Sequence, residues 1–365
     1  MKRAGNLWPE VTSFANLLAA SEAAAAGKRK RPDVAAFLLE LEPRLVTLRR
    51  ELLAGTYRPG AYRTFTITDP KPRQISAAPF RDRVVHHALT RVLEPVFEKG
   101  FSPFSFACRK GFGVHQALRV AEEGSRRYRY VLKLDVRKYF ASIDHEILAA
   151  KLARKIKCRP TLDLTGIIIA GSNPQEEVIR YFAGDNLFTP HGRRRGLPLG
   201  NQTSQFFANV YLDGLDQFVT RRLRPGAYAR YVDDLVLFSN SASELHAMHR
   251  AISAVIGGDR LVLHERKSRV YRCTEGLTFL GWRLFRSHTR LARADVARFA
   301  KRMRGLQRDW EAARVEWESI HQSVQAWIGH ASFGDTRVLR ERLLGRYSFV
   351  RGLPSKTAAG GCVQQ

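Results

Sequence analysis

An acidic turn between two apolar runs is the feature that most constrains the fold of this chain. Residues 231–234 read Tyr-Val-Asp-Asp and lead directly into the apolar run Leu-Val-Leu-Phe at 235–238. This pattern predicts a β-hairpin whose tip carries carboxylates out of a hydrophobic core. Adjacent side chains on an extended strand point to opposite faces. Only one of Asp233 and Asp234 can therefore face a given ligand, unless the turn redirects the other.

This arrangement calls for a third carboxylate, because neighbouring like charges are tolerated when a divalent cation lies between them and a further acid. Asp135 ends the apolar run at 130–135, so a strand would hold it rigidly at the edge of the core. We expect Asp135 and Asp233, on neighbouring strands, to hold two Mg²⁺ ions roughly 4 Å apart, with Mn²⁺ as a substitute. Taken alone, Asp135 could cap the following turn, but the acidic hairpin and the basic chain favour the metal site.

The net charge of +27, from 61 Lys and Arg against 34 Asp and Glu, indicates a polyanionic partner. Nucleic acid is the first expectation and an anionic membrane the second, while a GC-rich coding bias is the alternative explanation of the basic composition. The sequence contains no run of 18 apolar residues and no apolar signal core, so we expect a cytoplasmic location and no membrane partner. The four cysteines lack metal-binding spacing and are expected to be free thiols.

Hydrophobic periodicity predicts an α+β fold with helical extensions at both ends. Helices are expected at 14–26, 32–53, 80–97, 144–156, 161–182 (interrupted at 171–174), 203–223, 242–256 and 294–350. Strands are expected in a hairpin with a basic tip between 57 and 75, at 130–135, on both sides of the acidic turn, and in short pieces through 282. Residues 192–200 form a basic loop rich in Gly and Pro.

The motifs between residues 57 and 282 resemble those of the reverse transcriptase family in content and order. Asp135 and the box at 231–234 match its catalytic motifs, and segments 104–106 and 111–118 resemble the sequence before its first palm strand. The resemblance implies synthesis of cDNA on a template RNA from deoxynucleoside triphosphates, with an RNA–DNA duplex as product. It also implies a right-hand polymerase fold, with an N-terminal helical extension at 1–56, fingers at 57–129, a palm at 130–285 with a fingers insertion at about 150–200, a helical basic thumb at 286–352 and a disordered tail at 353–365.

The resemblance assigns roles to individual residues. The catalytic residues are Asp135, Asp233 and Asp234, and the metal ligands are Asp135, Val136 and Asp233. The residues expected at the incoming triphosphate are Arg73, which holds the phosphates, Phe140, the steric gate against a 2′-hydroxyl, and Lys71, Leu199, Gly200, Gln205 and Lys267. Those expected at the nucleic acid are Tyr231, the primer-grip residues Leu280, Gly281 and Trp282, and Arg298, Lys301, Arg302 and Arg304 of the thumb. A basic face is more often only solvated, and Trp310, Trp317 and Trp327 are expected in the core.

One departure from the family pattern concerns fidelity. Leu199 stands where the family usually has Gln in a Pro-Gln-Gly string, and Ser204 precedes Gln205 where many relatives have Ser-Pro. Together with residues 209–216, these features resemble the enzymes of diversity-generating retroelements. Because Leu cannot form the hydrogen bond that checks base-pair geometry, about one to a few kcal/mol of selectivity would be lost.

The resemblance therefore implies misincorporation opposite template adenines for mutagenic retrohoming, together with a small basic helical accessory protein oligomer. Three alternatives stay open. Leu199 could be a packing variant of ordinary fidelity, the chain could be a group II intron-like or retron-like reverse transcriptase, or it could be a non-catalytic RNA-binding derivative.

Overall fold

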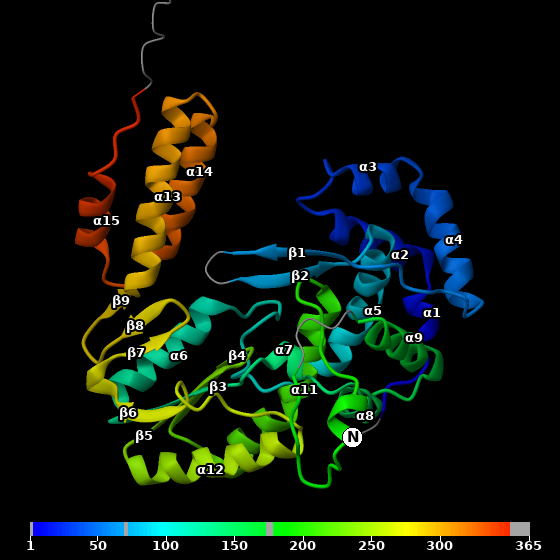
Figure 1. Cartoon of the computed structure of the whole chain (residues 1–365), viewed down its shortest axis with the longest axis horizontal. Coiled ribbons are helices and arrows are strands. Elements are labelled where there is room, and N and C mark those ends of the chain that lie inside the picture. Colours follow the sequence, from blue (N-terminus) through cyan, green and yellow to red (C-terminus); the bar gives the residue numbers. More distant parts are fainter. Residues whose placement is uncertain (1–2, 69–71, 173–177, 351–365) are drawn as a thin grey trace, which may run out of the picture. The chain divides into compact units, whose positions relative to one another are not determined.

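The acidic hairpin lies in an antiparallel sheet with the strand order β4-β5-β3-β6 (Figure 1). Strands β4 (Ala227–Tyr231) and β5 (Asp234–Ser239) pair through Tyr231 and Asp234, which leaves a two-residue turn. Strand β3 (Tyr130–Asp135) pairs with the other edge of β5, and β6 (Arg269–Arg272) completes the sheet. The hairpin and the strand ending in Asp135 are thus present as predicted, and they are neighbours in space.

The computed structural model describes residues 3–68, 72–172 and 178–350, and the chain divides into two compact units. Unit 1 contains the described residues up to Val120 together with Tyr130–Tyr271. Unit 2 contains Ala121–Arg129 and the described residues from Arg272 onward. Helices and antiparallel strands occur in both, in agreement with the predicted mixed class. The disordered tail expected at 353–365 lies outside the described residues.

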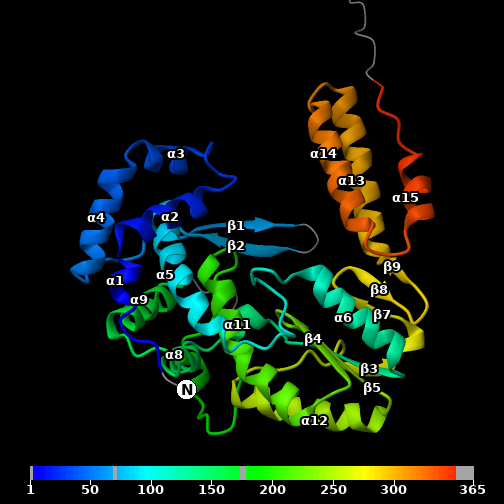
Figure 2. The same cartoon turned by 180° about the vertical axis from the view of Figure 1, so that it is seen from behind.

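Unit 1 is mainly helical around its sheet (Figures 1 and 2). Its N-terminal helices are α1 (Trp8–Val11), α2 (Phe14–Ala25), α3 (Pro32–Leu39) and α4 (Leu41–Leu53), and its other helices are α5 (Phe80–Glu98), α7 (Tyr139–Ser142), α8 (His145–Ala153), α9 (Arg159–Ala170), α10 (Thr189–Gly192), α11 (Gln202–Phe218), which continues as a π-helical turn (Val219–Leu223), and α12 (Ala242–Gly258). The Ser13 side chain caps α2 as expected, by accepting a hydrogen bond from the Asn16 N–H. The helix expected up to residue 182 ends at Ala170, and residues 178–182 are not helical.

A two-stranded hairpin precedes α5. Strands β1 (Arg63–Ile67) and β2 (Arg73–Ala77) pair antiparallel, as the alternation of side chains predicted. Every residue of β1 is exposed to solvent. The tip of the hairpin, which includes the expected phosphate contact Lys71, lies outside the described residues.

Unit 2 consists of a small sheet and three helices, with helix α6 (Val114–Arg127) crossing the boundary between the units. A one-turn 3₁₀ helix (Cys273–Glu275) precedes strands β7 (Leu277–Phe279), β8 (Trp282–Leu284) and β9 (Thr289–Leu291), which form an antiparallel meander. Helices α13 (Arg293–Glu311), α14 (Trp317–Ala331) and α15 (Arg337–Leu344) follow. The segment expected to be helical at 294–350 thus contains α13, α14 and α15.

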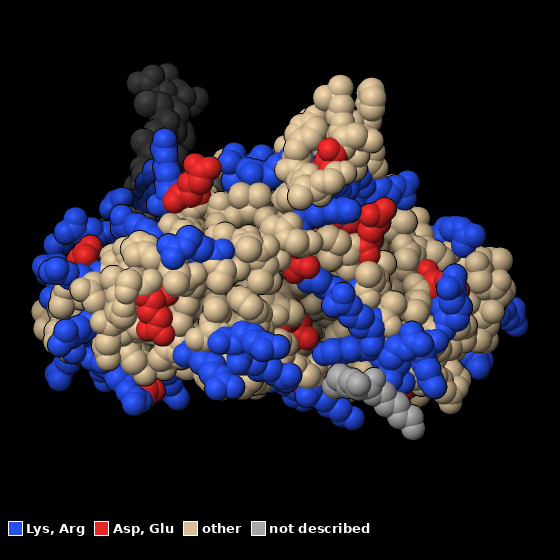
Figure 3. Space-filling view, turned by 90° about the horizontal axis from the view of Figure 1, so that it is seen from below, with Lys and Arg blue, Asp and Glu red and all other residues tan. Residues whose placement is uncertain are grey.

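Basic side chains cover much of the molecular surface. In the face drawn in Figure 3, Lys and Arg spread widely while Asp and Glu form small separate patches. Within the part of the chain that the structure describes, no helix combines the length and apolarity needed to span a bilayer.

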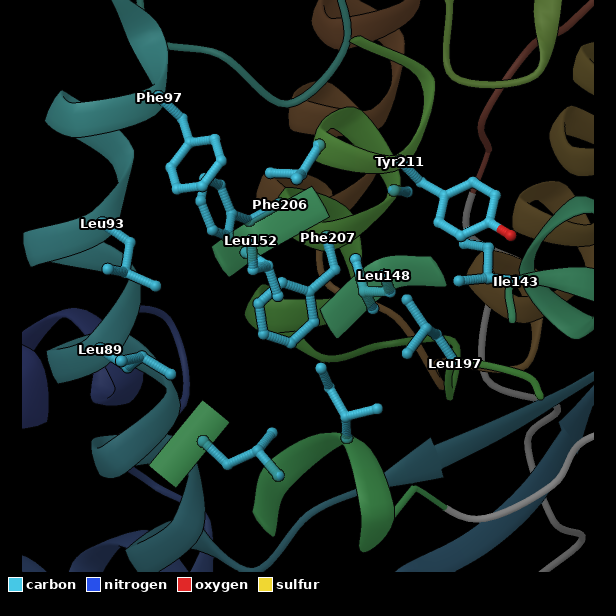
Figure 4. Packing of buried hydrophobic residues seen from close by; sticks show 14 of the residues in the cluster. Leu89, Leu93, Phe97, Ile143, Leu148, Leu152, Leu197, Phe206, Phe207 and Tyr211 are labelled. Atoms are coloured by element: carbon cyan, nitrogen blue, oxygen red, sulfur yellow. The ribbon is translucent and has the colours of Figure 1, made fainter. Parts of the chain in front are cut away.

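The core of unit 1 forms where α5 and α11 pack against the segment around α8 (Figure 4). Leu89, Leu93 and Phe97 extend from α5 toward side chains of α11, and the rings of Phe97 and Phe206 meet edge to face with centroids 5.4 Å apart. Each buried side chain of this kind contributes about 1.5–3 kcal/mol relative to an exposed one. This packing fixes the N-terminal end of α11, which directly follows Leu199 and Gly200.

A buried ion pair fixes the acidic hairpin to α11. Arg230 and Asp216 are each 1% exposed, and two guanidinium nitrogens donate to the two carboxylate oxygens over 2.7 and 2.6 Å. The Tyr228 hydroxyl donates to the same carboxylate over 2.6 Å. Arg230 also donates to the Ser105 hydroxyl over 2.7 Å and to the main-chain carbonyl of Val232, in the acidic turn, over 2.9 Å. The turn is thus held by a fully hydrogen-bonded charge inside the protein.

Replacing Arg230 with Met should destabilise the protein strongly, because it leaves the Asp216 carboxylate buried without a counter-charge. Removing one partner of such a pair costs about 3–5 kcal/mol. We expect the free energy of unfolding in urea to fall by that amount. The exposed Arg222→Met variant removes the same charge from the surface and should change it by less than about 0.5 kcal/mol. Equal effects of the two substitutions would contradict the role assigned to the pair.

Candidate active site

The acidic turn has an unusual backbone conformation. Val232 has a φ of 57°, in the left-handed region that β-branched residues rarely adopt. This conformation allows the two-residue connection between Tyr231 and Asp234. It also takes Asp233 out of the alternation of the strand, so Asp233 belongs to the turn while Asp234 begins β5. The turn therefore supplies the redirection that two adjacent carboxylates need.

Asp135 and Asp234 lie directly opposite each other on β3 and β5. Opposed residues of an antiparallel pair project from the same face of the sheet, so these two carboxylates share a face. The Lys133 ammonium, two residues before Asp135, lies 3.6 Å from Asp234 Oδ1. That distance is too long for a hydrogen bond. Asp234 Oδ1 is a buried oxygen without a hydrogen-bond partner among the described residues.

A tight turn at residues 264–268 attaches to Asp135. The main-chain N–H of His264 donates to the Asp135 carbonyl over 2.7 Å, and the Asp135 N–H donates to the Ser268 hydroxyl over 3.3 Å. The same turn carries Lys267, whose ammonium donates to both carboxylate oxygens of Asp135 over 3.0 Å. Lys267 therefore neutralises Asp135 at the position that a cation would take.

The other two carboxylates are electrostatically unfavourable as they stand. Burial, followed by the charges of Asp234 and Asp135, raises the pKa of Asp233 to about 6, although Lys267 partly opposes this. Burial also raises the pKa of Asp234, with Lys133 acting in the opposite direction. In both cases burial disfavours the charged carboxylate more than the nearby lysines favour it.

A cavity of about 440 Å³ within unit 1 reaches Asp233, but neither Asp135 nor Asp234 lines it. It is lined by Pro72, Arg73, Gln74, Lys138, Phe140, Ala141, Leu199 and Asp233. Four residues expected at the triphosphate or the metal, which are Arg73, Phe140, Leu199 and Asp233, thus meet around one space. They come from the exposed hairpin, from the segment after β3, from the loop before α11 and from the acidic turn.

Main-chain contacts fix Leu199 and Gly200 against β2. The Ser76 N–H donates to the Leu199 carbonyl over 3.1 Å. Gly200 has a φ of 112°, and a Cβ at this position would lie 3.1 Å from the Ile75 side chain. The close approach of the loop to the hairpin therefore requires glycine here.

Other predicted residues take different positions. Gln205 is exposed on α11 and is not among the residues that line the cavity. Tyr231 is half-buried at the end of β4. The Val136 side chain is buried, so only its main-chain carbonyl has the chemistry of a metal ligand. The prediction missed Lys138, which lines the cavity, and Lys133, which faces Asp234. Both lysines lie close to Asp135 in the sequence, and this closeness could have predicted that they belong to the site.

In unit 2, Leu280 and Gly281 form the two-residue turn between β7 and β8, both with positive φ. Trp282 is fully buried, and its ring lies 5.2 Å from that of Phe333. The indole of Trp282 thus belongs to the core that supports the turn and is not exposed in this structure, so its contact with nucleic acid stays a prediction.

The basic residues of α13 are exposed as expected, and they are Arg298, Lys301, Arg302 and Arg304. The opposite side of α13 packs inward through Phe299, whose ring stacks on Trp327 with centroids 3.8 Å apart. Trp327 therefore packs against the core of unit 2, as expected. Trp317 is 53% exposed, which contradicts the core position expected for it.

The donor set suits a hard divalent cation. Its ligands would be carboxylate oxygens, one of which has no hydrogen-bond partner among the described residues, and burial together with the neighbouring carboxylates raises the pKa of Asp233. Within residues 3–68, 72–172 and 178–350, no three acidic, His or Cys side chains are already gathered as a metal cluster.

Comparison with known protein families gives the same class as this geometry. Residues 68–284, more than half of the chain, match the family model described as "Reverse transcriptase (RNA-dependent DNA polymerase)". The chain belongs to the reverse transcriptase family, and its enzyme class is RNA-directed DNA polymerase. Members of this family generally use divalent metal ions and act on template RNA and deoxynucleoside triphosphates.

Several curated proteins are similar over parts of the chain. Protein YkfC of Escherichia coli (strain K12) is 26% identical over 292 residues, which cover 69% of this chain and 74% of that protein. The group II intron-encoded protein LtrA of Lactococcus lactis subsp. cremoris is 26% identical over 183 residues, covering 49% of this chain and 28% of LtrA. Nuclear intron maturase 2 of Arabidopsis thaliana mitochondria is 29% identical over 136 residues, covering 33% and 18%. The chain thus spans less than a third of the latter two proteins.

Replacing Asp233 with Asn should stabilise the metal-free protein at neutral pH. A pKa raised from about 3.9 to about 6 means that the folded state binds more protons between these values. The contribution of Asp233 therefore becomes less favourable as pH rises from 4 to 6 and stays so above. With EDTA present, we expect the stability gain of Asp233→Asn over the native chain to be about 2 kcal/mol larger at pH 7.5 than at pH 4.5.

Urea unfolding at both pH values measures this difference. The exposed Asp163→Asn variant controls for the loss of one surface carboxylate. A gain that does not grow with pH would show that Asp233 is not held in an unfavourable ionised state.

Proposed function

We propose that this chain copies RNA into DNA by two-metal phosphoryl transfer, in a right-hand polymerase fold with the N-terminal extension, fingers, palm and thumb at the boundaries given above. The observation that carries the proposal is the cavity at which Arg73, Phe140, Leu199 and Asp233 meet, beside the paired Asp135 and Asp234. A guanidinium can bind phosphates, and a carboxylate can bind a metal ion. An aromatic ring can pack beside a sugar, and an aliphatic side chain can pack beside a base pair.

In this proposal, Asp135, Asp233 and the carbonyl of Val136 hold two Mg²⁺ ions, and Asp234 adds negative charge beside them. The bound ions would lower the pKa of the primer 3′-hydroxyl and neutralise the triphosphate for in-line attack on the α-phosphorus. Arg73 binds the phosphates through two N–H groups. Lys267, which pairs with Asp135 in this structure, would be placed to contact a phosphate of the triphosphate. Phe140 occupies the space that a 2′-hydroxyl would need.

We further propose relaxed fidelity of the diversity-generating retroelement type. Leu199 lines the cavity, so the nascent base pair would meet an aliphatic side chain that cannot test hydrogen-bonding geometry. A structured template RNA and a small basic helical accessory protein oligomer would complete the system. The second candidate is a group II intron-like enzyme of ordinary fidelity, which the similarity to LtrA favours. A non-catalytic RNA-binding derivative is the third.

Replacing Asp233 with Ala should abolish Mg²⁺-dependent incorporation, because the site loses a ligand and the cavity loses its carboxylate. We expect the rate of deoxynucleotide addition to a DNA primer on an RNA template to fall by at least about 10³-fold, equivalent to about 4 kcal/mol. Asp163→Ala, an equal change on the exposed side of α9, should retain the native rate. Unchanged incorporation by Asp233→Ala would remove the catalytic assignment and favour the non-catalytic derivative.

Replacing Leu199 with Gln should restore a polar check at the base pair. We expect errors opposite template adenine to fall about 10-fold, which corresponds to about 1.4 kcal/mol of regained selectivity. Leu199→Met keeps an apolar side chain of similar size and should keep the native error pattern. Sequencing cDNA made on a defined RNA template measures both. If the native chain makes errors equally at all four template bases, the mutagenic proposal fails and the enzyme is of the ordinary-fidelity type.

A further inference from the structure

A row of basic side chains lies on α5, away from the residues that line the active cavity. Arg83, His87 and Arg91 are spaced at i, i+4 and i+8, so they share one face of the helix. Each step of four residues advances about 6 Å along the helix axis. That distance is comparable to the separation of successive phosphates in a nucleic-acid strand.

The connection between α2 and α3 adds two cations beside this row. Lys28 and Arg31 are exposed in a turn closed by main-chain hydrogen bonds, in which the Arg31 N–H donates to the Lys28 carbonyl over 3.0 Å. Lys28, Arg31, Arg83, His87 and Arg91 together form what we call the α5 basic cluster. Its members lie close enough to act on one another: burial and the charges of Lys28, Arg83 and Arg91 lower the pKa of His87, while burial and the charges of Arg83 and Arg31 lower that of Lys28.

Negative charge is scarce in this cluster. Asp33 pairs with Arg83 over 2.8 Å. Among the described residues, no carboxylate forms an ion pair with Lys28, Arg31 or Arg91. The Nε of Arg83 is buried and has no hydrogen-bond partner within the same part of the chain. Asp33 offsets Arg83 and Glu94 acts on Arg91, so the protein compensates the positive charge of the cluster only in part.

Contacts with neighbouring residues hold the side chains of the cluster in place. The Arg83 guanidinium lies 5.1 Å from the centre of the Phe80 ring. Arg91 donates to the Asn16 side chain over 3.1 Å, and Asn16 in turn donates to the Ala88 carbonyl of α5 over 3.0 Å. These contacts join α2 to α5 beneath the charges. Ordered charged side chains such as Arg83 and Arg91 lose less conformational entropy on binding than free surface lysines do, and the neutral His87 between them can still donate a hydrogen bond.

We infer that the α5 basic cluster binds the phosphodiester backbone of a structured RNA, at a site separate from the polymerase cavity. None of its five members lines that cavity. A regular row over two helical turns suits a polymer with evenly spaced phosphates, and RNA is the polymer on which this family acts. The site anchors a folded part of the RNA while another part is copied. The binding itself does not depend on catalysis.

The test compares two double variants of the full chain. Lys28→Gln with Arg91→Gln removes two exposed charges from the cluster, and Arg221→Gln with Arg222→Gln removes two exposed charges from the end of α11. The affinity for a labelled RNA hairpin of about 20 base pairs is measured against salt concentration, in the presence of excess short primer–template duplex that occupies the cavity. Incorporation on that short duplex is measured separately.

We expect the cluster variant to bind the hairpin about 10-fold more weakly, with a salt slope about 2 units smaller, since each lost phosphate contact contributes about 0.9. The control variant should change the affinity less than about 2-fold, and both variants should extend the short primer at the native rate. Equal weakening by both variants, unchanged hairpin affinity, equal loss of short-primer extension, or binding of anionic vesicles in place of the hairpin would each overturn the inference. Failure of the native chain to extend any primer would count against the proposed function alone, because hairpin binding is read independently.

Discussion

The buried pair of Arg230 and Asp216 is the interaction on which the geometry of the site depends. Two charges removed from water are costly unless every donor and acceptor is satisfied. Here the hydroxyls of Tyr228 and Ser105 and the carbonyl of Val232 meet that requirement. Because the guanidinium reaches the acidic turn itself, it offsets the strain of the left-handed Val232. Helix α11, the segment before α6 and the acidic hairpin are thereby fixed to one another by a single side chain.

The carboxylates of Asp135, Asp233 and Asp234 are less well satisfied than this ion pair, because the nearby lysines offset only part of their negative charge. Lys267 covers Asp135, Lys133 lies near Asp234, and Asp233 responds with a raised pKa. A more stable chain would replace one of these acids with a neutral residue. Sites that must accept a cation commonly sacrifice stability in this way. The rigid network around Arg230 and the unfavourable acidic cluster are therefore complementary: the first maintains the position of the second.

Much of this could be predicted from local sequence, and the remainder required tertiary structure. The strand–turn–strand pattern predicted the hairpin, and the strand ending in Asp135 predicted the third carboxylate. The direct register of Asp135 with Asp234 depends on how distant strands pair, which periodicity does not encode. The left-handed Val232 breaks a residue preference because Arg230, which the buried Asp216 holds in place, supports it. The sequence predicted that Trp282 contacts nucleic acid, but the packing of unit 2 buries its side chain. The ends of the helix predicted at 161–182 were likewise beyond what apolar spacing could define.

The hydrogen bond from the Ser76 N–H to the Leu199 carbonyl has a mechanical consequence. Arg73 and Ser76 belong to the same short strand, so a shift of that strand toward a phosphate group pulls the Leu199 backbone with it. Arg73 and Leu199, which line the same cavity, are therefore joined through one strand and one hydrogen bond. If the proposed function holds, the contact with the triphosphate and the surface that meets the base would be mechanically coupled, so that selectivity for the base would depend on how this strand is placed.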